Sequence, residues 1–276
     1  GSAANAKWTG GTSTPVALGN LAVGSNATQM SELVGKWFLG TDLPNATVSI
    51  GGPSFTVTYS IQKSPLYAAS GPSMADINQG YLGDCYFLAS LAEVAKQSPS
   101  AIQSMFVDNG NGTYGVRFFY NGMAQYVTVN SALAGGGSKF NKDPSALWAS
   151  LAEKAYAQFQ ATYLETGNSV NYGNSWSTIG NGGDPIYALE AITGSSSLTD
   201  YIASGSSWRA YNYQSSLNYT GSTSGISNAS LQSTLIADLN AGYDLVLCSW
   251  TNAYDSAGKQ TLVSSHALSI YGFDNA

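Results

Sequence analysis

The chain has 276 residues, which is enough for one large domain or two packed subdomains with a substantial core. Ten Lys and Arg residues stand against 16 Asp and Glu residues, giving a net charge of −6, and the basic residues are scattered. This charge distribution argues against a nucleic-acid partner, and without an apolar run of about 20 residues we expect no membrane span.

The first part of the chain, residues 3 to about 65, is rich in Gly, Asn, Thr and Ser. An alternation of polar and apolar residues from 47 to 61 predicts short strands there. A helix is predicted over 83–97, because Leu88, Leu91 and Ala95 share one face and Pro99 follows. This places Cys85 at the first turn of the helix.

Two β-rich runs follow, residues 114–120 and 124–129, around Asn121-Gly122, which is a strong signal for a type I′ hairpin. Asp143-Pro144 predicts the start of a second helix, and Asp184-Pro185 that of a third, which Gly194 would end. The apolar face of the second helix would consist of Leu147, Trp148, Leu151, Ala155 and Phe159.

Residues 195–230 are rich in Ser and Tyr and are interpreted as a linker or loop. A fourth helix is predicted over 230–240, followed by strands over 243–250 and 262–273 with a polar turn between them. Helices therefore dominate from 83 to 195 and strands from 243 onward, which predicts an α+β fold. We expect an N-terminal lead-in segment at 1–65, a helical lobe at 66–195 and a β-rich lobe at 196–276.

Only two cysteines are present, Cys85 and Cys248, too few for a disulfide framework. Cys248 lies in an apolar run and is expected to be a buried core thiol. Cys85 is expected at a helix N-terminus, where the thiol pKa is lowered. The single histidine, His266, lies in an apolar strand and is either a packed core residue or a base brought to Cys85 from the other lobe.

The residues around Cys85 decide between these readings. The run DINQGYLGDCYFL, residues 76–88, strongly resembles the active-site segment of the calpain-type cysteine peptidases. Later stretches agree in order: the hairpin at 112–129, LWASLAEKAYA at 147–157, ALEAITG at 188–194 and SHALSIYG at 265–272. The resemblance covers about residues 70–276 and points to a bacterial member of the family.

The resemblance implies a papain-like, two-lobed α+β fold and an endopeptidase that acts on polypeptides through a thioacyl intermediate. Cys85 would be the nucleophile, His266 the base, and Gln79 an oxyanion donor together with the backbone N–H of Cys85. Asp84 would complement the helix dipole. Tyr86 stands where many relatives have Trp, so the aromatic character is retained.

One departure concerns the asparagine that orients the histidine in this family, within an Asn-Pro-Trp-Gly segment further along the chain. No Asn-Pro occurs here and the sequence ends at Ala276, so we expect a C-terminally shortened chain. Asn275 and Asn252 are the possible local substitutes. Two alternatives stay open: a non-catalytic binding or adhesion module that retains the fold, and a thiol-dependent acyltransferase.

No cofactor is required for the implied chemistry. Animal relatives bind calcium in the protease core, and Asp76 matches the position of one acidic ligand, with Glu165 as another candidate. Asp76 would otherwise cap a turn. The composition, poor in Lys and rich in Asn, Ser and Thr, favours a secreted protein.

Overall fold

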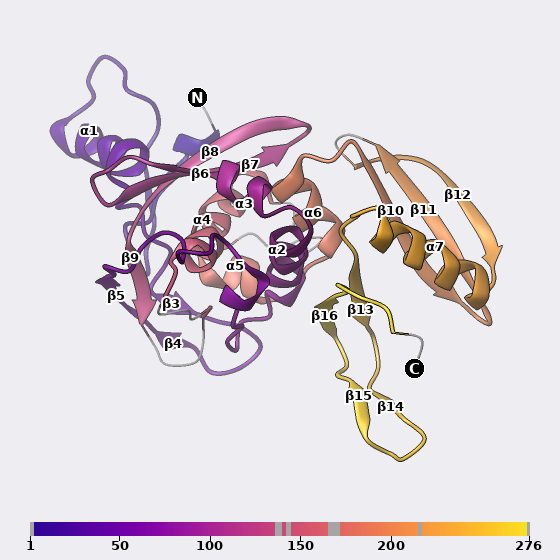
Figure 1. The fold of residues 1–276 in the computed structure, drawn as a ribbon. Coiled ribbons are helices and arrows are strands. Elements are labelled where there is room, and N and C mark those ends of the chain that lie inside the picture. Colours follow the sequence, from indigo (N-terminus) through magenta and orange to yellow (C-terminus); the bar gives the residue numbers. More distant parts are fainter. Residues whose placement is uncertain (1–2, 136–139, 142–144, 165–171, 215–216, 275–276) are drawn as a thin grey trace.

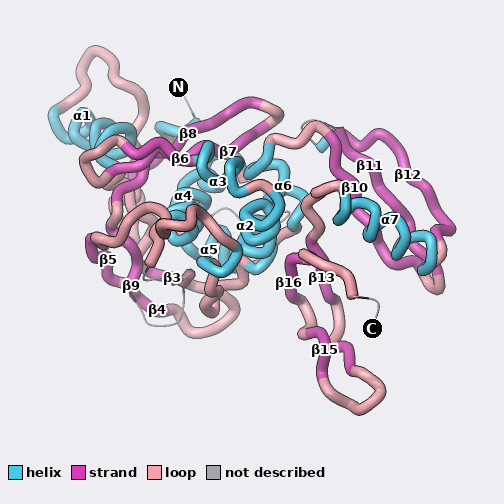
Figure 2. Tube along the Cα trace, in the orientation of Figure 1, coloured by secondary structure: helices cyan, strands magenta, loops and turns pink. Residues whose placement is uncertain are grey.

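The computed structural model describes residues 3–135, 140–141, 145–164, 172–214 and 217–274. Helices and strands both contribute, so the fold is mixed α and β as predicted (Figures 1 and 2). The larger helices gather at the centre of the molecule, and the strands after residue 196 extend to one side of them (Figure 1). Within the described ranges, no helix combines the length and apolar character that crossing a bilayer requires.

The N-terminal segment consists of short elements. The alternation from 47 to 61 forms strands β3, β4 and β5, and β5 pairs with β9 of the following part of the chain. The elements of the N-terminal segment are η1 (Ala3–Asn5), β1 (Lys7–Trp8), β2 (Val16–Ala17), α1 (Ala27–Val34), the π-helical turn η2 (Gly35–Leu39), β3 (Thr47–Val48), β4 (Phe55–Thr56) and β5 (Thr58–Ile61).

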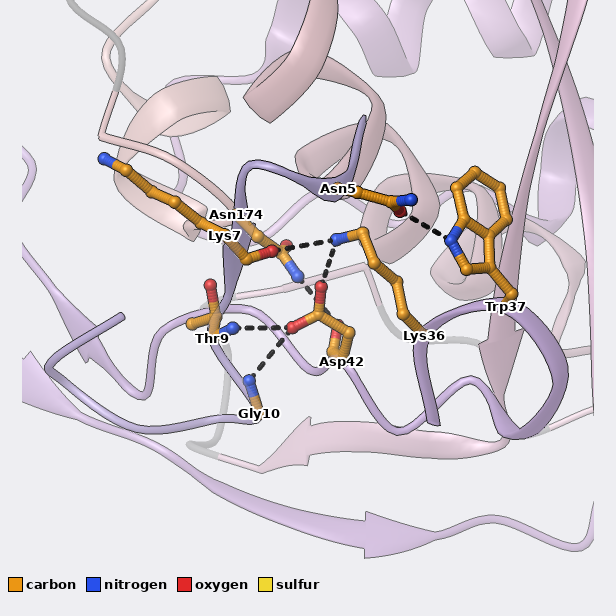
Figure 3. A network of polar contacts seen from close by, with 8 residues as sticks. All are labelled: Asn5, Lys7, Thr9, Gly10, Lys36, Trp37, Asp42 and Asn174. Carbon is orange, nitrogen blue, oxygen red and sulfur yellow. Dashed lines mark hydrogen bonds and ion pairs between the residues drawn. The ribbon is translucent and has the colours of Figure 1, made fainter. Parts of the chain in front are cut away.

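A buried ion pair lies inside this segment, and Asn174 joins its acidic partner to a later part of the chain (Figure 3). The ammonium of Lys36 pairs with Oδ2 of Asp42, and both side chains are buried. Oδ1 of Asp42 accepts from the backbone N–H groups of Thr9 at 2.8 Å and Gly10 at 3.0 Å. Asn174 donates to the Asp42 carbonyl at 2.7 Å. Removing one partner of such a pair leaves a buried charge uncompensated, at a cost of about 3–5 kcal/mol.

The core lies among helices α2, α4 and α6 and the sheet beside them. The rings of Phe87 and Tyr156 stack with centroids 3.9 Å apart, and Phe118 of the sheet lies 5.5 Å from Tyr156. These contacts join residues from three elements into one aromatic cluster. The helices of this part of the chain are η3 (Met74–Asp76), α2 (Cys85–Gln97), α3 (Pro99–Met105), α4 (Trp148–Tyr163), α5 (Trp176–Gly180) and α6 (Pro185–Thr193).

The predicted helices α2 and α6 are confirmed. Asp184 caps α6 by accepting from the N–H of Ile186 at 3.1 Å, and Gly194 ends it with a left-handed φ of 66°. The sequence missed α3, in which Pro99 occupies the first turn. The start of α4 at Asp143-Pro144 was wrong: the helix begins at Trp148, and residues 143–144 lie outside the described residues.

The start of α4 is set by a distant segment. The backbone N–H groups of Leu147 and Trp148 donate to the carbonyl of Leu66 at 3.2 and 3.0 Å. Because another part of the chain satisfies these first N–H groups, the helix needs no side-chain cap at its N-terminus. A local capping signal therefore could not locate the boundary.

The predicted hairpin is confirmed in an antiparallel three-stranded sheet. Asn121 and Gly122 have φ values of 52° and 69°, as a type I′ turn requires. Central strand β7 pairs with β6 on one side and β8 on the other. The strands are β6 (Phe106–Asp108), β7 (Thr113–Tyr120), β8 (Met123–Asn130) and, pairing with β5, β9 (Ala132–Gly135).

The linker predicted for 195–230 was wrong. Most of it forms a three-stranded antiparallel sheet, β10 (Ser197–Ser204), β11 (Ser207–Gln214) and β12 (Asn218–Ile226), followed by α7 (Asn228–Asn240). Most side chains of this sheet are at least partly exposed. Its strands therefore lack the alternation of apolar and polar residues by which a half-buried strand is recognised in a sequence. The Gly205-Ser206 pair between β10 and β11 was the hairpin signal that could have revealed it.

The last strands form two short ladders. Strand β13 (Val246–Ser249) pairs with β16 (His266–Ser269), and β14 (Ala253–Tyr254) pairs with β15 (Gln260–Leu262) around the predicted polar turn. Strand β16 also packs against α2 and so brings the end of the chain to the helical core (Figure 1). The division at 65/66 and 195/196 stays a prediction.

Candidate active site

Cys85 is the first residue of α2. The backbone carbonyl of Asp84, the residue at the N-cap, accepts from the N–H groups of Phe87 at 2.9 Å and Leu88 at 3.0 Å. Asp84 stands at the N-cap, not in the first turn, and its carboxyl group makes no capping hydrogen bond. The predicted helix-terminal setting of Cys85 is therefore confirmed.

An edge of strand β16 contacts the thiol of Cys85. The N–H of Ile270 donates to the carbonyl of Leu245, which makes this a hydrogen-bonded pair in the register of β13 and β16. Because such pairs alternate along an antiparallel ladder, the N–H of Ala267 points away from β13. It donates instead to the Cys85 thiol. Strand β16 and the N-terminus of α2 thus meet at the candidate nucleophile.

The pKa of Cys85 differs from the expectation. Burial raises it, and the charge of Asp84 adds to this, whereas hydrogen bonds from the backbone N–H groups of Ala267, Tyr86 and Cys85 itself lower it. The net shift is upward, so the helix terminus alone does not produce a thiolate, because removal from water penalises the charged form. A cationic partner is needed for that.

His266 precedes Ala267 and is half-buried. The backbone around it is fixed: Ser265 has a left-handed φ of 52°, and the buried hydroxyl of Ser249 bonds to the carbonyls of Val263 and, at 3.1 Å, His266. The histidine therefore lies one residue from the point of contact with Cys85. Among the described residues, no hydrogen bond joins its imidazole to the thiol.

Gln79 lies in the loop before α2 and is half-buried. Its amide nitrogen Nε2 donates to the carbonyl of Leu82 at 3.0 Å and lies 3.5 Å from Oδ1 of Asp84. Gln79 is thus held within a few residues of Cys85 by contacts from the same turn.

Of the two possible substitutes for the orienting asparagine, Asn252 and Asn275, the structure describes only Asn252. The Oδ1 atom of Asn252 already accepts from the N–H of Ser264 at 2.8 Å and from the side chain of Gln260 at 3.0 Å. Asn252 therefore supports the turn that leads into His266 rather than offering a free oxygen to the imidazole. Asn275 lies outside the described residues.

The carboxylate of Asp76 is used structurally. Its Oδ2 atom accepts from the N–H of Ser73 at 2.9 Å, in a capping box, and from the indole of Trp148 at 2.6 Å. Within the described part of the chain, no group of three His, Cys, Asp or Glu side chains is arranged to hold a metal ion. Glu165 lies outside the described residues. Oδ2 of Asp76 thus has two protein donors, and calcium binding stays a prediction.

The prediction that Cys248 is a buried core thiol was wrong, since its side chain is exposed. It lies opposite Ala267 in the ladder of β13 and β16, so the two side chains share a face, but Ala267 is buried there and Cys248 is not. Partial burial raises the pKa of Cys248, and the charges of Asp184 and Cys85 raise it further. The two thiols therefore lie near each other, but in different surroundings.

Sequence reasoning missed two features of the site. The Ala267 contact is made by a backbone N–H, which no residue pattern reveals. The other is Glu153 of α4, which is buried against Asp84. Glu153 lies in the stretch LWASLAEKAYA, but its position behind Cys85 depends on how α4 packs.

Comparisons with known proteins show the family of the chain. A family model described as calpain family cysteine protease matches residues 57–276. Calpain clp-4 of Caenorhabditis elegans is 28% identical over 148 residues, which cover 50% of this chain and 18% of that protein. Calpain-13 of Rattus norvegicus is 30% identical over 111 residues, which cover 37% of this chain and 16% of that protein.

A plant protein gives a similar match. The calpain-type cysteine protease ADL1 of Oryza sativa subsp. japonica is 33% identical over 112 residues, which cover 38% of this chain and 5% of that protein. The chain thus spans less than a fifth of the length of these relatives.

Proposed function

Because the chain belongs to the calpain family of cysteine proteases, we propose that it hydrolyses peptide bonds in extended polypeptides through a thioacyl intermediate. The observation that carries the proposal is the contact between the Cys85 thiol and the backbone N–H of Ala267, the neighbour of His266. This contact joins the N-terminus of α2 to the strand that carries the single histidine of the chain.

In the first half of the reaction, His266 takes the proton of the Cys85 thiol, and the sulfur attacks the peptide carbonyl carbon. The resulting oxyanion would receive hydrogen bonds from Nε2 of Gln79 and from the N–H of Cys85. Collapse of the tetrahedral intermediate breaks the C–N bond, and His266 returns the proton to the leaving amine. Water then attacks the thioester, with His266 again acting as base, and releases the acid product.

The imidazole has a second task in this proposal. Since burial raises the pKa of Cys85, the thiolate needs a positive charge beside it at neutral pH. A protonated His266 supplies that charge. Backbone N–H groups aimed at the sulfur assist, because they favour the charged form.

We also propose that the arrangement is papain-like, with a helical lobe carrying Cys85 and a β-rich lobe carrying His266. The packing of β16 against α2 supports this arrangement. Polypeptide is the proposed substrate. Secretion is supported by composition alone.

The test is incubation of the chain with an unrelated unfolded protein, followed by mass spectrometry of the peptides. Hydrolysed peptides that disappear with Cys85→Ala, but persist with the matched Cys248→Ala variant, are the expected result. Newly joined peptides would indicate an acyltransferase instead. If neither product formed, the chain would be a non-catalytic module of the family.

A further inference from the structure

Two buried carboxyl groups lie in contact directly behind the start of α2. Asp84 is 0% exposed, and Glu153 of α4 is 1% exposed. Their side chains are within hydrogen-bonding contact of each other. Oδ1 of Asp84 lies 3.5 Å from Nε2 of Gln79, and Oε2 of Glu153 accepts from the N–H of Asn141 at 3.1 Å. The pair therefore links α4 to Gln79 and to the residue before Cys85.

This contact requires a proton. Oδ2 of Asp84 and Oε1 of Glu153 are buried and receive no hydrogen bond from any N–H or O–H group of the described residues. Two ionised carboxylates in contact repel each other, and the repulsion is strong where water is excluded. A proton on one carboxyl group turns the repulsion into a hydrogen bond, as in other carboxyl pairs that share one proton.

We propose that Asp84 and Glu153 share one proton and act as positioning residues for Gln79, an inference that rests on the oxyanion role given to Gln79 in the proposed function. The amide nitrogen of Gln79 lies between two acceptors, the Leu82 carbonyl at 3.0 Å and Asp84 Oδ1 at 3.5 Å. A flipped amide would place its oxygen against both acceptors. The negative charge of the pair thus keeps the N–H side of the amide toward the Cys85 turn.

Few charged groups face the pair. Cys85 and Tyr86 follow Asp84 on α2, and burial raises the pKa of both groups, with the charge of Asp84 adding to each shift. Lys154 follows Glu153, but its ammonium donates to the carbonyls of Asn130 and Ala132 at 2.9 and 2.7 Å. In the described part of the chain, the one ion pair is that of Lys36 and Asp42.

The titration of the two acids agrees with a shared proton. Burial raises the pKa of Asp84 to about 7 and that of Glu153 well above its usual value. Because no cation compensates the pair, its single negative charge acts on the two nearest reactive groups, the thiol of Cys85 and the amide of Gln79.

The test compares Asp84→Asn with Glu153→Gln in two assays, the pH dependence of Cys85 alkylation by iodoacetamide and the hydrolysis of a peptide. Asp84→Asn moves the negative charge of the pair from the residue beside the thiol to Glu153, so the alkylation midpoint should shift to lower pH. The same variant loses the acceptor that holds Gln79, so kcat should fall about 10- to 100-fold with little change in KM. A merely structural role would not make the thiol easier to ionise while slowing turnover.

Glu153→Gln should behave differently, because its amide donates to Asp84 and leaves the negative charge there. Its alkylation midpoint should stay above that of Asp84→Asn, and its loss of kcat should be at least about tenfold smaller. Glu190→Gln is the matched control, since Glu190 is also buried but lies at the hairpin, 3.4 Å from the N–H of Gly122. Equal effects of the two test variants on midpoint and kcat would overturn the positioning role.

Infrared spectroscopy provides a readout without turnover. Because burial also raises the pKa of Glu93, to about 7, the readout is the difference from the wild type. At neutral pH, Asp84→Asn and Glu153→Gln should each lose the protonated-carboxyl band of the pair, and Glu190→Gln should keep it. Absence of that difference would overturn the shared proton whether or not peptides are cleaved. If the wild type shows the band but hydrolyses no peptide, the proposed function is overturned, and with it the role of the pair toward Gln79.

Discussion

Gly83 lies so close to Gly180 that a β-carbon on Gly83 would be 2.6 Å from the Gly180 carbonyl oxygen. The N–H of Gly83 donates to that same oxygen at 2.9 Å, and the N–H of Gly182 donates back to the Gly83 carbonyl at 2.9 Å. This short parallel bridge connects the turn before Cys85 to the end of α5. The position of the candidate nucleophile thus depends on a backbone approach that only glycine permits.

We therefore expect Gly83→Ala to destabilise the protein by about 1–3 kcal/mol, because a backbone oxygen cannot move aside as a side chain can. Peptide hydrolysis should fall as well, since the Cys85 turn is displaced. Urea unfolding and kcat measure the two effects. Gly52→Ala is the control, as no atom lies within 4 Å of the added carbon. Equal stability of the two variants would show that the bridge relaxes without cost.

Cys85 should react with iodoacetamide at neutral pH faster than the exposed Cys248, on the order of tenfold or more, because only the thiolate is nucleophilic. His266→Ala should remove this advantage, since burial then leaves Cys85 protonated. Peptide mapping of the labelled native protein measures both rates. Preferential labelling of Cys248 in the wild type would contradict the assignment of Cys85.

The buried acids should make stability depend on pH. A carboxyl group with a raised pKa in the folded state binds its proton where the unfolded chain has lost it. Its stabilisation is complete below the unfolded pKa of about 4 and is lost as pH rises through the folded pKa, about 7 for Asp84. Glu153→Gln should thus flatten the fall in unfolding free energy between pH 5 and 8. Parallel pH curves for the variant and the wild type would refute this.

Asp76→Ala should destabilise the protein by about 1–3 kcal/mol, since it leaves the Trp148 indole and the Ser73 N–H without their acceptor. The loss should be the same in millimolar calcium and in chelator, because these contacts occupy the carboxylate. Thermal unfolding in the two buffers is the measurement. A calcium-dependent rise in the wild-type melting temperature that Asp76→Ala abolishes would instead restore the calcium site.

Local signals predicted the elements that depend on neighbouring residues. The hairpin at Asn121-Gly122 and the cap at Asp184 follow from turn and capping chemistry, and both were found where expected. The start of α4 depends on the carbonyl of Leu66, far away in the sequence, and could not be predicted in this way. The sheet at 197–226 was missed because its polar strands bury little apolar surface.

Some features of the candidate site could likewise be predicted from neighbouring residues, and others could not. The resemblance around residues 76–88 placed Gln79 and Cys85 close together in the sequence, and the packing of β16 against α2 brings Ala267, the neighbour of His266, to the thiol. The contact of Asp84 with Glu153 joins residues 76–88 to residues 147–157, two stretches that the sequence analysis interpreted separately. Only the docking of α4 behind α2 makes these two acids neighbours, and a one-dimensional pattern does not contain that information.

The anchoring of the N-terminal segment also has a kinetic consequence. Asn174 bonds to Asp42 across 132 positions of the chain, Ser49 to Ser177 across 128, and Trp176 to Tyr59 across 117. Contacts of such large sequence separation slow folding, because the chain between them must be ordered first. We therefore expect the segment to close onto α5 late in folding, after the hairpin and the helices that flank Cys85 have formed.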